Sequence, residues 1–267
     1  MSVVLRERRG HVEIVTINRP EARNAIDFET SAALADVFDE IEADDDVWAV
    51  VLTGAGDKAF CAGMDLKAFA GGGNVMGVSG GFAGVTNRDF PKALIAACNG
   101  HALAGGFEIM LSCDMVVAAD HATFGIPEVK RGLVAGAGGI IRLAKRISLA
   151  PALELGMTGD AIDAQTAYLL GLVNRVLPGA EVLDAAVALA ERVCDAAPLA
   201  VRATKKVIKA SLELPEPEAW KMQGEAAAAV FTSPDALEGA TAFAEKRKPR
   251  WTGHLPPGAE LTGEPLS

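Results

Sequence analysis

An α/β fold is the class that this sequence predicts. Short apolar runs at residues 47–53, 93–97 and 115–119 are bounded by Gly, Asn or Asp, a pattern typical of buried strands. Helical patterns lie between these runs, and from about residue 137 onward the chain is mostly helical in pattern. Together these observations indicate a βαββ-type core followed by a helical C-terminal third.

The first elements are a hairpin and a helix. Residues 3–8 and 12–18 are rich in β-forming side chains and flank the turn at Gly10, which predicts an antiparallel pair. Asp27 is placed to cap a helix over residues 28–43. The predicted buried face of this helix carries Leu34, Val37, Phe38 and Ile41.

Gly and Pro residues mark the ends of the remaining predicted elements. The strand at 47–53 ends at Gly54, and residues 71–84 are glycine-rich and predict a mobile loop. A helix begins near Gly105. Residues 180–196, 199–211, 218–232 and 234–245 predict helices, and the segment from Pro249 predicts irregular structure. We expect two parts, a core over 1–196 and a helical region over 197–267.

Composition limits the class of function. The chain has 267 residues, is 50% hydrophobic and carries a formal net charge of −10, so it can bury a sizeable core and is poorly suited to bind nucleic acid or an anionic membrane. Its four cysteines form no CxxC and its four histidines no HxH or HxxxH pair, so we expect a reduced, cytoplasmic protein without a metal. No signal segment or membrane span is predicted.

Two glutamates next to glycine-rich turns carry the chemical signal. Glu108 follows Gly105 and Gly106, and Glu128 lies shortly before the glycines at 136, 138 and 139. Residues 60–67 offer a third exposed turn. Two carboxylates can share acid and base roles, and exposed backbone N–H groups can stabilise an oxyanion. This combination points to proton chemistry next to a carbonyl group.

In the order and spacing of its motifs the chain resembles the crotonase (enoyl-CoA hydratase/isomerase) superfamily. The resemblance spans residues 12 to about 250 and is strongest in Asn18–Ala25, Phe60–Lys67, the two glutamate segments, Thr158–Asp160 with Gly171–Val173, and Ala242–Arg247. It implies a spiral of ββα units with C-terminal helices that build homotrimers or homohexamers. It also implies that no metal or redox cofactor is needed, since coenzyme A belongs to the substrate.

The resemblance implies a role for each site residue. The backbone N–H groups of Met64 and Gly105 would form the oxyanion hole, and Glu108 and Glu128 would hold a water and move protons across a carbon–carbon double bond. Glu108 would take the proton of the water and Glu128 would deliver a proton to C2. The N–H of Gly136 would help to seat the water, although Ala135 stands where many relatives have Pro.

Coenzyme A binding is implied for a further set of residues. Arg23 and Lys67 would lie near the nucleotide, backbone groups near the adenine and pantetheine, and Lys246 would reach the nucleotide from a neighbouring subunit. For Lys67 and Lys246 a solvated surface role stays equally open. The backbone groups are those of Ala22, Ala62, Asp65 and Leu66.

Enoyl-CoA hydration is the predicted activity, and three alternatives stay open. They are an isomerase or other crotonase-type reaction on an acyl-CoA, an acyl-CoA binder with little turnover, and a serine hydrolase. The last rests on the GxSxG match around Ser79, where no apolar strand precedes the serine as a nucleophile elbow requires. Gly136 and Gly138 lack the third glycine and the strand of a dinucleotide fingerprint, so we predict no NAD site.

Overall fold

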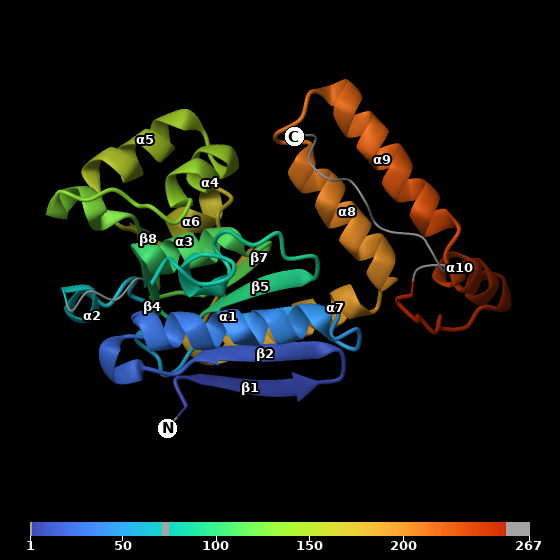
Figure 1. Cartoon of the computed structure of the whole chain (residues 1–267), viewed down its shortest axis with the longest axis horizontal. Helices are drawn as coiled ribbons and strands as arrows, with labels where there is room; N and C mark the ends of the chain where they lie inside the picture. The colour runs from blue at the N-terminus through green and yellow to red at the C-terminus, as the bar shows by residue number, and fades with distance from the viewer. Residues whose placement is uncertain (1, 71–74, 255–267) are drawn as a thin grey trace. The chain divides into compact units, whose positions relative to one another are not determined.

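The computed structural model describes residues 2–70 and 75–254, which fall into two compact units. One unit consists of the residues up to 90 together with 94–190. The other consists of residues 91–93 together with those from 191 on. The first unit holds both β-sheets (Figure 1), whereas the second is built mainly of helices. The predicted boundary between 196 and 197 stays a prediction.

A six-stranded sheet contains the strands that the sequence predicts. Its order is β1-β2-β3-β5-β7-β10, with β1 and β2 antiparallel and with β2–β3, β5–β7 and β7–β10 parallel. All residues of β3 and β5 are buried, which explains why all of them except Thr53 are apolar or glycine. The strands are β1 Val4–Arg9, β2 Val12–Ile17, β3 Ala49–Gly54, β5 Ala93–Cys98, β7 Met115–Ala119 and β10 Arg175–Leu177.

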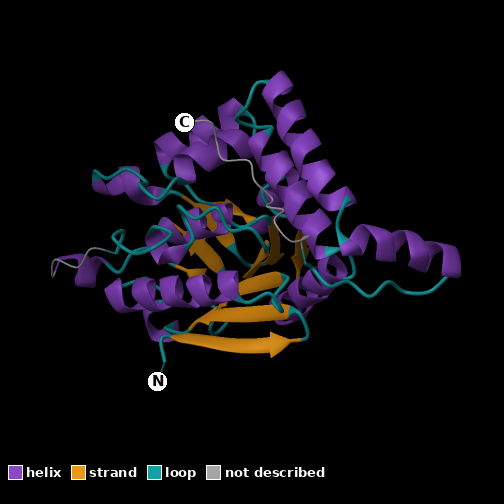
Figure 2. Ribbon diagram, turned by 45° about the vertical axis from the view of Figure 1, so that its right-hand side comes forward, coloured by secondary structure: helices purple, strands orange, loops and turns teal. Residues whose placement is uncertain are grey.

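A second, four-stranded sheet was not predicted. It comprises β4 (Ala59–Cys61), β6 (His101–Leu103), β8 (Thr123–Gly125) and β9 (Ile162–Asp163) in that order. Each strand has only two or three residues, too few for alternation to be visible in the sequence. Figure 2 shows the strands of the first unit with helices packed around them.

Helix α1 (Phe28–Ala43) begins where the sequence predicts. Asp27 Oδ1 accepts a hydrogen bond from Thr30 N at 2.8 Å and so caps the helix. Leu34, Phe38 and Ile41 are buried on one face. This agreement follows from a strong local signal, because the cap and the apolar face lie within one continuous segment.

The remaining helices are distributed over both units. Helix α3 begins at Gly105, as predicted, helix α4 packs against α3, and α5 packs against α4. The bounds are α2 Leu66–Ala70, α3 Gly105–Ser112, α4 Gly139–Arg146, α5 Leu149–Thr158, α6 Ala164–Leu169, α7 Val182–Cys194, α8 Pro198–Ala210, α9 Glu216–Phe231 and α10 Pro234–Glu245. The 3-10 helices are η1 Pro20–Ala22, η2 Phe82–Gly84, η3 Pro127–Arg131 and η4 Gly179–Glu181.

Candidate active site

The carboxyl edge of the four-stranded sheet gathers the three segments that the sequence singles out. Strands β4, β6 and β8 are parallel neighbours, and they lead into Met64, Gly105 and Glu128 respectively. Because parallel strands end at the same edge of a sheet, these residues meet there although they are far apart in the chain. A hydrogen bond of 2.9 Å from Ala104 N to Gly125 O ties two of the segments together.

The turns that carry Met64 and Gly105 lie against each other. A Cβ atom at Gly63, which has φ +93°, would lie 2.9 Å from Gly105 N and 2.8 Å from Ala104 Cβ, so only glycine permits this approach. Neither Met64 N nor Gly105 N donates a hydrogen bond to any acceptor in the described part of the chain. Two backbone donors are therefore available at the start of α3, where the helix dipole adds positive potential.

Ala104 adopts a backbone conformation that is rare for a residue with a side chain. Its φ of 53° and ψ of −130° precede Gly105 directly. Such conformations cost about 1–3 kcal/mol and occur where the surrounding structure enforces them. Here the enforced turn is the one that presents the N–H of Gly105.

Glu108 is held by the turn that precedes α4. It is 3% exposed, and its Oε1 accepts hydrogen bonds of 2.8 Å from both Ala137 N and Gly139 N. Burial raises the pKa of Glu108, while the two N–H groups and the charge of Arg142 oppose that rise. Gly136 precedes these two donors in the same turn, and its N–H donates to no acceptor in the described chain, so its predicted role in seating a water stays a prediction. The residues that bind Glu108, and Arg142 behind them, were missed.

Glu128 lies on the 3-10 helix η3, directly after Pro127. Its Oε2 is buried and has no hydrogen-bond partner within the described chain. Burial raises the pKa of Glu128, and the charge of Glu108 raises it further. Its own backbone N–H and the charge of Arg131 act in the opposite direction. The two carboxylates therefore interact, and Glu128 accepts fewer hydrogen bonds from the described chain than Glu108 does.

A phenyl ring covers the glycine at the start of α3. Phe82 is 1% exposed, and its Cε1 would lie 2.6 Å from a Cβ atom at Gly105. Its segment is fixed to α1, since Ser31 Oγ donates to Val75 O at 2.8 Å and accepts from Ala83 N at 3.1 Å. Residues 71–74 of the predicted mobile loop lie outside the described residues.

Ser79 does not lie on a strand-to-helix elbow. Its Oγ contacts Asp39 Oδ1 at 3.3 Å and Arg88 Nη2 at 3.2 Å, within a run of turns. Arg88 in turn forms ion pairs with Asp39 and Glu42 of α1. These contacts give Ser79 a part in holding the segment to α1.

Most residues predicted to bind coenzyme A surround the Met64 turn. Ala62 N donates to Arg23 O at 3.1 Å, and Asp65 N donates to Ile26 O at 2.8 Å, so these two N–H groups are already engaged. Asp65 also pairs with Arg19 at 3.1 Å. Arg23, Leu66 and Lys67 are exposed and Ala22 is partly exposed.

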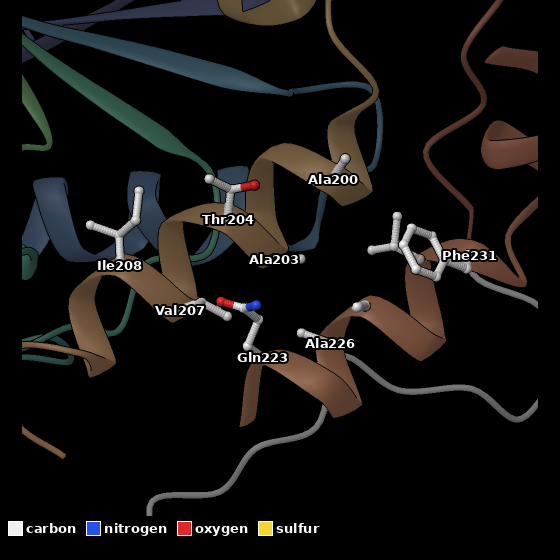
Figure 3. Close-up of a pocket in the computed structure, with 10 residues that line it drawn as sticks. Ala200, Ala203, Thr204, Val207, Ile208, Gln223, Ala226 and Phe231 are labelled. Atoms are coloured by element: carbon white, nitrogen blue, oxygen red, sulfur yellow. The ribbon is translucent and has the colours of Figure 1, made fainter. Parts of the chain in front are cut away.

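Lys246 belongs to the second unit, where it ends α10 in the left-handed conformation and is exposed. That unit also contains a groove of about 290 Å³ between α8 and α9 (Figure 3). The groove is lined mainly by Ala, Val, Ile and Phe, and its polar side chains are Thr204 and Gln223. Because no titratable side chain lines it, acid–base chemistry is not expected there.

Two further observations concern the described residues as a whole. None of their helices is both long and apolar enough to cross a membrane. No group of three His, Cys, Asp or Glu side chains among them is arranged to hold a metal ion.

Comparison with known proteins identifies the family. Residues 7–254 match the model of the enoyl-CoA hydratase/isomerase family. The chain belongs to this family. The crystal structure of an enoyl-CoA hydratase from Mycobacterium tuberculosis is 51% identical, with a TM-score of 0.92 over 95% of this chain and all of that one. The α/β crotonase fold and the assignment as a crotonase-type hydro-lyase are therefore confirmed.

Other relatives carry a different name. A carnitinyl-CoA dehydratase from Proteus mirabilis is 43% identical over 92% of this chain and 96% of its own length. A carnitinyl-CoA hydratase from Mycobacterium avium is 45% identical, with a TM-score of 0.77 over 95% of this chain and all of that one. The fold and the class are shared by both groups.

Proposed function

We propose that this family member is an enoyl-CoA hydratase that adds water across the C2=C3 bond of a 2-enoyl-CoA thioester. The observation that carries the proposal is a pair of interacting carboxylates, the buried Glu108 and the partly buried Glu128, beside two unused backbone donors. An isomerisation needs only one group to move a proton, whereas addition of water uses a base for the water and an acid for the carbon.

The backbone donors would act on the thioester. The carbonyl oxygen would accept hydrogen bonds from the N–H groups of Met64 and Gly105, which draws electron density from C3 and stabilises the enolate that forms. Removing one such donor typically costs about 2.7–4 kcal/mol of transition-state stabilisation. The start of α3 supports Gly105 in this role because the helix dipole favours negative charge there.

The two glutamates differ in a way that suits opposite roles. Glu108 accepts two backbone hydrogen bonds, which favour its ionised form and a role as the base. Glu128 has a buried oxygen without a hydrogen-bond partner in the described chain, which favours its protonated form and a role as the acid. Water would lose a proton to Glu108 as its oxygen bonds to C3, and C2 would take the proton of Glu128. A proton then returns from Glu108 to Glu128 and resets the pair.

The coenzyme would bind around the Met64 turn. Arg23 and Lys67 are exposed cations on the two segments that meet there, and they would compensate phosphate charge in a chain with a net charge of −10. Arg23→Ala and Lys246→Ala are each expected to raise KM in a salt-sensitive way. An unchanged KM for both at low salt would contradict the assignment.

Assembly into a homotrimer or homohexamer is part of the same proposal. The C-terminal helices α8, α9 and α10, which would build this assembly, expose large apolar side chains of the kind that another chain often covers. These side chains include Ile208 (60% exposed), Phe231 (78%), Leu237 (72%) and Phe243 (87%). Equilibrium ultracentrifugation tests the mass of the assembly, and a monomer at micromolar concentration would contradict the prediction.

The deciding experiment follows the loss of enoyl-thioester absorbance with crotonyl-CoA. The wild type is expected to form 3-hydroxyacyl-CoA, and Glu108→Gln and Glu128→Gln are expected to lower kcat by about 10²–10⁴-fold. Binding of acyl-CoA and the melting temperature serve as controls for folding. Wild-type rates in both variants would refute the mechanism.

Dehydration of carnitinyl-CoA is the second candidate, because relatives named carnitinyl-CoA dehydratase or carnitinyl-CoA hydratase are 43% and 45% identical. It uses the same two carboxylates in the reverse direction, so the protein should be assayed with carnitinyl-CoA under the same conditions. A kcat/KM for carnitinyl-CoA far above that for crotonyl-CoA would favour this candidate. Free coenzyme A release, in contrast, would indicate hydrolysis.

A further inference from the structure

Arg142 lies directly behind the turn that binds Glu108. It is the fourth residue of α4, and its guanidinium group folds back over the start of its own helix. A Cβ atom at Gly138 would collide with Arg142 Nη1, so glycine at that position leaves the space that the guanidinium fills. Gly138 also has φ +88°, a conformation that other residues rarely adopt.

The guanidinium of Arg142 joins two segments that are distant in sequence. Its Nη1 donates to Ala137 O at 3.2 Å, and its Nη2 donates to Thr86 O. Thr86 belongs to the segment that places Phe82 over Gly105. Arg142 therefore connects the turn that holds Glu108 with the segment that covers the start of α3.

The turn that Arg142 contacts also binds Glu108. Ala137 offers its carbonyl oxygen to Arg142 and its N–H to Glu108 Oε1, so the cation and the carboxylate lie on either side of one residue. Among the described residues, two charged groups are coupled to Glu108, Arg142 from α4 and Glu128 from η3. The charge of Arg142 lowers the pKa of Glu108, whereas the charge of Glu108 raises the pKa of Glu128.

We propose that Arg142 is a positioning residue for the hydration step, holding the turn at residues 137–139, and with it Glu108, against the Thr86 segment. Arg142 itself does not touch the reacting atoms in this scheme. The inference rests on the proposed function for its kinetic consequence, but the placement of Glu108 can be measured without turnover.

The kinetic test compares Arg142→Met, Arg142→Lys and Lys145→Met, the last being an exposed cation on the same helix that serves as the matched control. Arg142→Met is expected to lower kcat at least 10-fold with KM for crotonyl-CoA within about twofold of the wild type. The acid limb of its kcat–pH profile should move up by about one pH unit, because an opposite charge has been removed from beside the base. Arg142→Lys should return the limb close to its wild-type position, and Lys145→Met should leave it unmoved.

The second test follows the carboxyl carbon of Glu108 by ¹³C NMR in the substrate-free protein, with Glu108→Gln to assign the signal. In Arg142→Met the titration of this carbon should shift to higher pH, whether or not the wild type hydrates crotonyl-CoA. The proposal would be overturned if, in Arg142→Met, neither the titration of Glu108 nor the acid limb of the kcat–pH profile moved and kcat fell only as far as thermal stability did. That result would show that Arg142 has a merely structural role. Absence of wild-type hydration with a shifted titration would instead overturn the proposed substrate and leave the role of Arg142 standing.

Discussion

Gly139→Ala should separate catalysis from folding at this site. A Cβ atom at residue 139 would lie 2.6 Å from Glu108 Cγ and 3.0 Å from Oε1, whereas ordinary contacts begin at 3.4 Å. The Cγ atom of Glu108 must therefore move by about 0.8 Å (3.4 − 2.6 Å), and the carboxylate moves with it. A misplacement of about 1 Å typically costs about 10²-fold in rate. We expect kcat for enoyl-CoA hydration to fall by about that factor, which corresponds to about 2.7 kcal/mol.

Folding should survive this substitution because the obstructing atoms belong to the flexible end of a side chain. Gly139 is the first residue of α4, and alanine is a better helix former than glycine. The assay is the loss of enoyl-thioester absorbance, with thermal melting measured in parallel. Gly156→Ala in α5 is the matched control, since a Cβ atom there meets nothing within 4 Å. A folded Gly139→Ala protein with wild-type kcat would refute the placement of Glu108 as the base.

Three further outcomes follow from the packing and the charges. Gly106→Ala would place a Cβ atom against the backbone carbonyl at the end of β4. It should lower the free energy of unfolding, measured by denaturant titration, by about 1–3 kcal/mol. A variant as stable as the wild type would contradict the close contact. Glu128→Gln should raise the melting temperature near pH 8. Burial raises the pKa of Glu128 in the folded protein above its value in the unfolded chain, so the wild type loses stability as the pH rises through these two pKa values. The difference in melting temperature between the variant and the wild type should vanish below the pKa of Glu128 in the unfolded chain. Asp235→Ala removes a buried carboxylate that accepts hydrogen bonds of 2.7 Å from Thr252 N and 2.9 Å from Gly253 N. Hydrogen exchange of these two amides should therefore accelerate. Unchanged exchange would contradict the idea that Asp235 anchors this segment.

Local signals in the sequence were sufficient for the main elements. The hairpin, the Asp27 cap of α1, the strand β7 and the start of α3 at Gly105 all depend on patterns within a few residues. The strands β4, β6, β8 and β9 were missed because two or three residues cannot show a period. Three of those missed strands, β4, β6 and β8, share the edge that brings Met64, Gly105 and Glu128 together.

The motif order in the sequence by itself determined the family, and it named both glutamates and the two backbone donors as candidates. Only the tertiary structure decided what each candidate touches. Glu108 is held by the N–H groups of Ala137 and Gly139, and Arg142 stands behind them. The physical reason is that these hydrogen bonds join segments about 30 residues apart in the chain. Whether two such segments meet depends on how the chain folds back, which neither hydrophobic periodicity nor local propensity specifies.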